Sequence, residues 1–224
     1  MHEMPTLTLT PQGVPAHQWA SGDCQRPASA STCDLQNLDH VLQCYTGSHN
    51  LLINACAPLL GLCGVLTRLS SEAEIGTTRM ELTRAIVDLK FKVVQQDYPP
   101  SVAEHLCLLF AIAFDEFIMA SSWGKDSGWE NRTLVADLFG FRDGGDRFYK
   151  IAERALLQPK ALREFLEIVC IILKLGFRGK YPHGAERERD LLIDRLNTAL
   201  SLTPFPDVAN PVGRPVVDLS LIHI

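Results

Sequence analysis

The sequence has no net positive charge with which to attract an anionic partner. Its 224 residues include 21 Lys and Arg against 26 Asp and Glu, which gives a formal net charge of -5 at pH 7. A chain of this balance carries no basic field to attract nucleic acid or an anionic membrane surface. We therefore expect no nucleic-acid partner.

The sequence also lacks an apolar run long enough to cross a bilayer, which takes about 20 residues in a helix. Its longest apolar run, residues 51–66, is shorter and contains Asn54 and Pro58. The first residues, MHEMPTLTLTPQG, have neither the basic nor the apolar region of a signal peptide. We expect no membrane-spanning segment within these 224 residues.

Common metal and catalytic motifs are missing as well. The seven cysteines are odd in number, never form CxxC, and several lie within apolar runs of helical spacing. This pattern indicates reduced, buried thiols in a cytoplasmic environment. No HExxH, GxSxG or Walker motif is present, and GFRGKY lacks the spacing of a phosphate-binding loop. We expect no metal and no cofactor.

Most of the chain between residues 49 and 202 shows helical patterns. Asn50 is a predicted N-cap for a helix that runs through Pro58, and Ser101 with Glu104 predicts a capping box further on. In the helix expected over residues 77–97, one set of apolar side chains is predicted to form the buried face: Met80, Ile86, Val87, Phe91 and Val94.

Two segments are apolar on almost every side, namely residues 106–114 and the run KALREFLEIVCIILKLGF after Pro159. Such helices lie at the centre of a fold. Further helices are expected over residues 129–139, 146–157 and 186–202, and strand signals are scarce. The sequence therefore predicts an all-α fold of six to eight helices, with no sheet.

The two ends of the chain differ from this helical domain, which we place at residues 49–202. Residues 1–48 are rich in Pro, Ser, Thr and Gly and are interpreted as a flexible leader. Residues 203–218 are proline-rich and are interpreted as a linker. Residues 219–224, LSLIHI, match the translation of a transposon-end adapter used in sequencing libraries, so we expect the native chain to continue past Asp218.

The segment FDEFIMASSWGKDSGW, residues 114–129, holds two adjacent carboxylates, Asp115 and Glu116. Neighbouring residues on a helix point about 100° apart, so the pair is poorly placed to act on one substrate atom. It can equally be a solvated or capping helix end, and Trp123 and Trp129 can be core anchors. Two further clusters can be a helix start and a helix terminator: Gly144, Gly145 and Asp146, and Gly179, Lys180 and Tyr181.

The order of these pieces resembles a known family. NLLINACAPLL, FDEFIMASSWG, SGW, TLV, GGDRFY and LEIVCIILKLGFRGKY, followed by a charged helix, are similar to the cytoplasmic domain of the DotU/TssL (IcmH) family of type VI secretion systems. The resemblance covers about residues 50–202. It implies a non-enzymatic, hook-like domain of two helical bundles, followed by a C-terminal transmembrane helix in the inner membrane.

The resemblance also implies partners and the residues that contact them. The partners are a TssM/IcmF-like membrane protein, a TssJ-like lipoprotein and a TssK-like baseplate protein, and a homodimer is left open. The predicted partner-binding residues match the family's motifs, with the acidic pair as a docking rim: Asp115, Glu116, Trp123, Gly124, Trp129, Gly144, Gly145, Asp146, Gly179, Lys180 and Tyr181.

This sequence departs from the family at a few positions. Phe139 and Phe141 stand where many members carry His and Glu, and Pro182 replaces the usual Arg, so the polar cleft is expected to carry less charge. Two other functions stay open at this point. One is a soluble enzyme that uses Asp115 or Glu116 as a general base, and the other is a free cytosolic helical adaptor.

Overall fold

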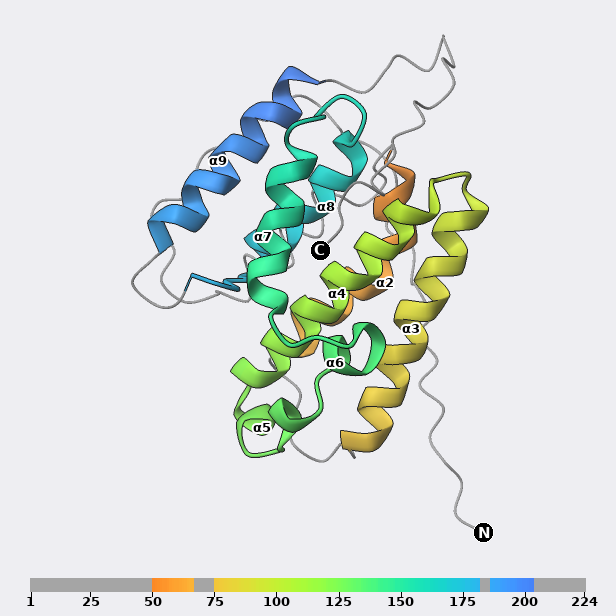
Figure 1. Cartoon of the computed structure of the whole chain (residues 1–224), viewed down its shortest axis with the longest axis vertical. Coiled ribbons are helices and arrows are strands. Elements are labelled where there is room, and N and C mark those ends of the chain that lie inside the picture. Colours follow the sequence, from red (N-terminus) through yellow and green to blue (C-terminus); the bar gives the residue numbers. More distant parts are fainter. Residues whose placement is uncertain (1–49, 67–74, 182–185, 204–224) are drawn as a thin grey trace, which may run out of the picture. The chain divides into compact units, whose positions relative to one another are not determined.

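The computed structural model describes residues 50–66, 75–181 and 186–203 (Figure 1). The chain divides into two units, Met1–Thr32 and Cys33–Ile224, and every described residue belongs to the second. The predicted leader and tail lie outside the described residues, as does the predicted linker apart from Thr203.

The described part of the chain is helical and contains no strand, which confirms the predicted all-α class and its six to eight helices. Eight α-helices and one short 3-10 helix follow one another in this order: α2 (Leu51–Leu66), α3 (Ile75–Gln95), α4 (Pro100–Ala120), α5 (Ser122–Lys125), η1 (Trp129–Asn131), α6 (Leu134–Phe139), α7 (Gly144–Ala155), α8 (Arg163–Lys174) and α9 (Glu186–Leu202). No described helix is both long enough and apolar enough to cross a bilayer.

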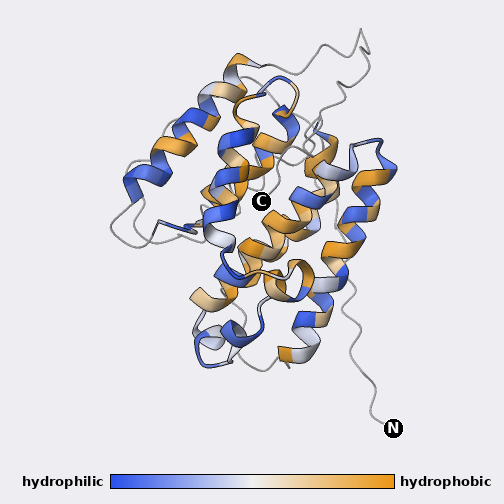
Figure 2. Cartoon of the chain, viewed as in Figure 1, coloured by the Kyte–Doolittle hydropathy of each residue, from blue (hydrophilic) through white to orange (hydrophobic). Residues whose placement is uncertain are grey.

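Helix α4 is the centre of this arrangement, as its apolar sequence predicts. It packs against α2, α3, α5, α6, α7 and α8, and its residues from Leu106 to Asp115 are all buried. Figure 2 shows hydrophobic residues along the middle of this helix. The second apolar helix, α8, is buried from Ile168 to Leu173 and packs against α2, α7 and α9.

The first helix is fixed at its start by Asn50, the predicted N-cap. The Asn50 side chain accepts a hydrogen bond from the Ile53 amide at 3.1 Å and donates to the Glu164 carbonyl at 2.9 Å. Tyr98 follows α3 in the sequence, and its hydroxyl donates a hydrogen bond to the Glu164 carboxylate. The start of α2 and the end of α3 therefore meet at the beginning of α8.

Two predicted helix starts are wrong. Helix α4 begins at Pro100 behind Pro99, without a side-chain cap, because proline at the first position needs no hydrogen-bond partner for its nitrogen. Glu104 instead forms a surface ion pair with Lys90 at 3.2 Å. Helix α8 begins at Arg163, several residues after Pro159, because residues 156–162 form turns that bury Leu162.

The helix expected over residues 129–139 is divided in two. A 3-10 turn starts at Trp129, and the chain then restarts as α6 with Thr133 as its N-cap; the Thr133 hydroxyl accepts from the Ala136 amide at 3.2 Å. Threonine at this position satisfies an amide that the first turn of a helix leaves without a partner.

The predicted buried face of α3 is also wrong for most of its members. Met80 and Phe91 are 66% and 64% exposed, and Val87 and Val94 are exposed as well. Ile86 is buried, together with Leu82, Leu89 and Val93. The helix thus has two apolar sides, and only the second packs against α2 and α4.

The described cysteines fit the prediction of buried, reduced thiols. Cys56, Cys63, Cys107 and Cys170 are free and buried. Burial raises the pKa of the Cys107 thiol to about 11 and raises the pKa of the other three. These thiols are therefore protonated at neutral pH, and protonated thiols are poor nucleophiles and metal ligands.

Candidate functional site

Asp115 lies in α4 and points into the protein, where it is only 4% exposed. Its Oδ1 accepts hydrogen bonds from the Trp129 indole at 2.7 Å and the Leu134 amide at 2.8 Å, and its Oδ2 accepts from the Val135 amide at 2.9 Å. The carboxylate therefore satisfies the first two amides of α6 and places its negative charge at that helix's N-terminus.

The Asp115 carboxylate lies in a buried environment. Burial raises the pKa of its carboxyl above the ordinary value, while the hydrogen bonds from Val135, Leu134 and Trp129 act in the opposite direction. From α3, the Arg79 guanidinium lies 4.5 Å from the centre of the Trp129 ring, in cation-π contact. Asp115 thus joins α4 to two segments that lie beyond α5, namely η1 and α6.

Glu116 points to a different side of α4 and holds a different segment. Its Oε1 accepts a hydrogen bond from the Arg178 amide at 2.6 Å, and its Oε2 accepts from the Gly179 amide at 2.7 Å. Burial again raises the pKa of the carboxyl, opposed by these two hydrogen bonds. The loop after α8 is therefore tied to the central helix across more than sixty residues of sequence.

The two glycine motifs meet at this loop, which we call the 177–181 loop. A Cβ at Gly145 would lie 3.0 Å from the Gly179 carbonyl carbon, so a side chain there would press on the loop backbone. Gly179 itself has φ +58, and a Cβ on it would lie 2.8 Å from the Tyr149 ring. Both glycines are needed for the close approach of α7 to the loop.

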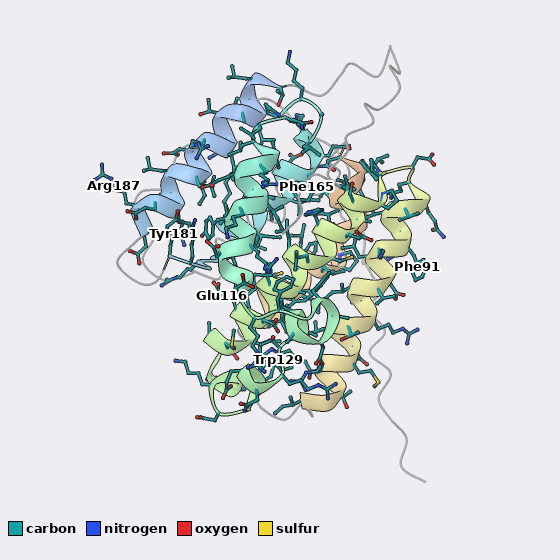
Figure 3. All side chains as sticks on the ribbon, in the orientation of Figure 1. Phe91, Glu116, Trp129, Phe165, Tyr181 and Arg187 are labelled. Carbon is teal, nitrogen blue, oxygen red and sulfur yellow. The ribbon has the colours of Figure 1, made fainter. Side chains whose placement is uncertain are left out.

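Aromatic residues complete the support of the 177–181 loop. The Tyr149 hydroxyl donates to the Arg178 carbonyl at 2.6 Å, and its ring contacts Tyr181 edge to face, with centroids 4.6 Å apart. The rings of Phe148 and Phe177 pack nearby in a tilted arrangement, with centroids 4.2 Å apart. Figure 3 shows Glu116 and Tyr181 on the side of the molecule where α7 and this loop lie.

Trp123 and Gly124 form a third anchor, away from the loop. The buried Trp123 ring donates its indole N–H to the Leu66 carbonyl at 3.0 Å, so it closes the end of α2. Gly124 lies against the end of α4, where a Cβ would sit 1.8 Å from the Ile118 carbonyl oxygen. The Ser121 hydroxyl fixes the same turn by accepting from the Gly124 amide at 3.0 Å.

The predicted site residues therefore fall into three groups. One surrounds Asp115 and Trp129, one surrounds Trp123 and Gly124, and the third unites Glu116 with the two glycine motifs: Gly144, Gly145, Asp146, Gly179, Lys180 and Tyr181. The acidic pair does not end α4, which continues to Ala120. Its carboxylates are directed at backbone amides and form no exposed acidic rim, because each accepts hydrogen bonds from inside the fold.

Sequence reasoning missed several residues of these groups. Tyr149 is the clearest case, because it follows Phe148 in the GGDRFY motif and supports the loop with its hydroxyl. Ser121 was also missed, although a serine three residues before Gly124 is a common helix cap. Arg79 lies about fifty residues from Trp129, and no local pattern indicates their contact.

Phe139 and Phe141, two positions at which this sequence differs from many family members, lie close to each other, with ring centroids 6.3 Å apart. The Arg147 guanidinium lies 3.8 Å from the centre of the Phe141 ring and pairs with Asp143 at 2.9 Å. Phe139 and Phe141 thus contact each other, and Phe141 also contacts Arg147. Pro182 lies outside the described residues.

A groove of about 870 Å³ opens beside the 177–181 loop. Tyr181 lines it together with residues of α7, α9 and the turn before α8, among them Leu156, Lys160, Leu191 and Arg195. Neither Asp115 nor Glu116 lines this groove. Within the described residues, no cluster of three or more His, Cys, Asp or Glu side chains could hold a metal ion.

The fold and the site define an all-α domain in which separate sequence motifs hold loops against one central helix. The sequence model of the family described as type VI secretion system protein DotU matches residues 51–216. This is well over half of the chain, and the chain belongs to that family. The resemblance found in the sequence is therefore confirmed, and the protein is a component of a type VI secretion system.

Solved structures agree with this assignment. The chain is 25% identical to TssL from Vibrio cholerae, with a TM-score of 0.61, over 69% of this chain and 98% of that one. SciP/TssL from enteroaggregative Escherichia coli 042 is 18% identical, with a TM-score of 0.58, over 73% of this chain and 95% of that one, and it supports the fold alone. No curated protein sequence matches the chain.

The hydrogen bonds of Asp115 predict that even the conservative substitution Asp115→Asn destabilises the protein. In Asp115→Asn, the amide NH₂ would face a backbone or indole N–H, and a buried donor without an acceptor costs about 1 to 3 kcal/mol. We expect a loss of this size in the free energy of unfolding, measured with urea. Glu104→Gln on the same helix is the control, and it should cost less than about 1 kcal/mol because that ion pair is exposed. Equal effects of the two variants would contradict the anchoring role.

The Trp123–Gly124 anchor gives a second prediction. Trp123→Ala should lower the free energy of unfolding by about 3 to 5 kcal/mol through the lost packing of a buried ring. Gly124→Ala should also destabilise the protein, because its Cβ would overlap the Ile118 carbonyl. At Gly61, within α2, a Cβ meets nothing within 4 Å, so Gly61→Ala should be neutral or stabilising by up to about 1 kcal/mol. A loss below about 1 kcal/mol for Trp123→Ala would refute the anchor.

Proposed function

We propose that this protein is a non-enzymatic scaffold of the type VI secretion envelope complex, and that its helical domain docks other components through the 177–181 loop and the groove beside it. The observation that carries the proposal is the convergence of Glu116 and Gly145 on the loop that contains the Gly179-Lys180-Tyr181 motif. Two distant parts of the sequence, α4 and α7, hold this short loop in a fixed position, and a fixed loop lowers the entropic cost of binding a partner.

The loop presents a charged side chain next to aromatic surface. Lys180 is an exposed residue whose ammonium lies 5.3 Å from the centres of both the Tyr149 and Tyr181 rings. Its contact with Asp146, at 3.9 Å, is long for an ion pair between partly exposed groups, and such pairs contribute little. Lys180 can therefore exchange this contact for a carboxylate of a partner.

The groove extends the same surface with apolar area. Leu191 and Leu202 of α9 line it and are 54% and 75% exposed, and charged residues such as Glu188 and Asp194 surround them. An apolar centre with a charged rim is typical of protein interfaces. We assign to this surface the docking role first expected for the acidic pair. Glu116 holds the loop of this surface, whereas Asp115 holds η1 and α6.

The partners we propose are those implied by the family: a TssM/IcmF-like membrane protein, a TssJ-like lipoprotein in the same complex, and a TssK-like baseplate protein. We further propose that the protein functions at the inner membrane, with this domain in the cytoplasm and a C-terminal helix as its anchor. Neither the general-base alternative nor the free adaptor has an observation in its favour. Both carboxylates of the acidic pair accept hydrogen bonds from backbone amides.

The docking proposal predicts charge-sensitive binding at Lys180. With the TssK-like and TssM-like proteins of the same secretion system, Lys180→Glu should weaken capture of at least one about tenfold, because it reverses a charge at the interface. Lys125→Glu, a charge reversal at an exposed position in α5, should leave capture unchanged. Circular dichroism must show the same helix content for both variants. Equal capture by Lys180→Glu and the native chain would exclude this surface as the docking site.

A further inference from the structure

Helix α9 contributes one row of exposed side chains to the groove beside the 177–181 loop. The row consists of Glu188, Leu191, Arg195, Thr198 and Leu202, which all line the groove. Their spacings of three, four, three and four residues place them on one side of the helix. The same alternation of three and four forms the seam along which one helix packs against another. At 1.5 Å per residue the row is about 21 Å long, or about four turns.

The row is available to a partner because a different side of α9 holds this helix to the protein. Leu192 and Leu196 are its buried residues, and α9 packs against α8. Leu156, which follows α7, and Pro159, in the turn before α8, are half-buried and also line the groove. The groove therefore has apolar groups from α9 and from the chain between α7 and α8.

The shape and composition of the groove favour a helix as its occupant. The described residues contain no strand, so a partner has no sheet edge here to which it could add a strand. Proline-rich segments bind grooves lined by aromatic rings, and only Tyr181 is aromatic among the described residues that line this one. A helix with apolar side chains at matching spacings fits the seam of α9.

The contacts of α9 show which part of α7 lies at each end of the groove. Burial raises the pKa of the Tyr149 hydroxyl, and the nearby positive charge of Arg189 opposes this shift, so the start of α9 lies near the middle of α7. Glu153 lies one turn beyond Tyr149. At the end of α9, the Arg163 guanidinium at the start of α8 donates to the Thr203 carbonyl. Helices α7 and α9 therefore run in the same direction (Figure 1).

The charged residues that line the groove differ between its two ends. Glu153 and Glu188 are exposed and line it toward the start of α9. Lys160, three residues before α8, is exposed and lines it toward the end of α9. Asp194 and Arg195, between the two ends, contribute no net charge. The lining is thus acidic at one end and basic at the other.

We propose that the groove binds an amphipathic helix of a partner protein, with apolar side chains at spacings of three and four, an acidic first turn and a basic last turn. The acidic turn lies beside Lys160 and the basic turn beside Glu153 and Glu188, which pairs opposite charges at both ends. Acidic residues at the start of a helix and basic residues at its end also stabilise the helix itself. The bound helix runs antiparallel to α7 and α9.

This inference rests on the proposed docking function and names the kind of segment that its groove takes. Lys180 does not line the groove. The partner carboxylate that contacts Lys180 therefore belongs to another part of the docked protein.

The test uses two labelled synthetic peptides of about 15 residues, stapled as helices, with leucines at spacings of three and four. One carries two glutamates in its first turn and two lysines in its last turn, and the other carries glutamine at those four positions. We expect the charged peptide to bind the native chain about tenfold more tightly at low ionic strength, because it gains ion pairs at both ends. Fluorescence anisotropy measures both affinities.

Variants of the whole chain locate the bound peptide. The double variant Leu191→Ser, Leu202→Ser should weaken both peptides at least about tenfold, because it removes exposed apolar side chains from the row. Glu188→Gln and Lys160→Gln should each weaken the charged peptide about threefold and leave the glutamine peptide unchanged. Lys125→Glu, in α5, is the control and should change neither affinity. Circular dichroism must show the same helix content for all variants.

Three results would overturn the inference: equal affinity of the native chain for the two peptides, binding of neither, or binding that the double serine variant leaves unchanged. Capture of the TssK-like and TssM-like proteins judges the docking function separately. Capture that Lys180→Glu weakens and the double serine variant leaves intact would keep the docking function and exclude the helix from the groove. Capture that both weaken, and with which the charged peptide competes, would support both.

Discussion

The structure depends on two consecutive carboxylates that point away from each other on the central helix. Asp115 accepts from the amides that open α6, and Glu116 accepts from the amides of the loop after α8. Each carboxylate is costly to remove from water, as the raised pKa of both groups reflects. That cost is offset only while the amides remain in place. The pair therefore links the positions of both segments to α4.

The rest of the site follows from this link. Glu116 fixes the amides of Arg178 and Gly179, α7 approaches the same loop closely, and glycine at position 145 makes that approach sterically allowed. Tyr149, also on α7, holds the loop through the hydrogen bond from its hydroxyl to the Arg178 carbonyl. The exposed Lys180 belongs to this loop, so the contacts of Glu116 and Tyr149 also fix its backbone position. In the proposed docking function, this fixed surface is the part that a partner would contact.

Much of the fold could be predicted from the sequence, because helical periodicity and all-apolar helices are local signals. The 100° step between neighbouring residues of a helix also correctly predicts that Asp115 and Glu116 point in different directions. It does not predict what each one contacts, since their partners lie up to 63 residues away in sequence. The capping box at Ser101 was wrong because proline supplied a better helix start. The face of α3 was misjudged because that helix has two apolar sides, and periodicity alone does not say which one meets α4.

The central claim is that each carboxylate holds one segment, and it is tested most directly by amide exchange resolved residue by residue with NMR. In Asp115→Asn, the amides of Leu134 and Val135 should exchange at least about tenfold faster, while those of Arg178 and Gly179 change little. In Glu116→Gln the pattern should be reversed. Equal acceleration of all four amides in both variants, or of none, would contradict the account.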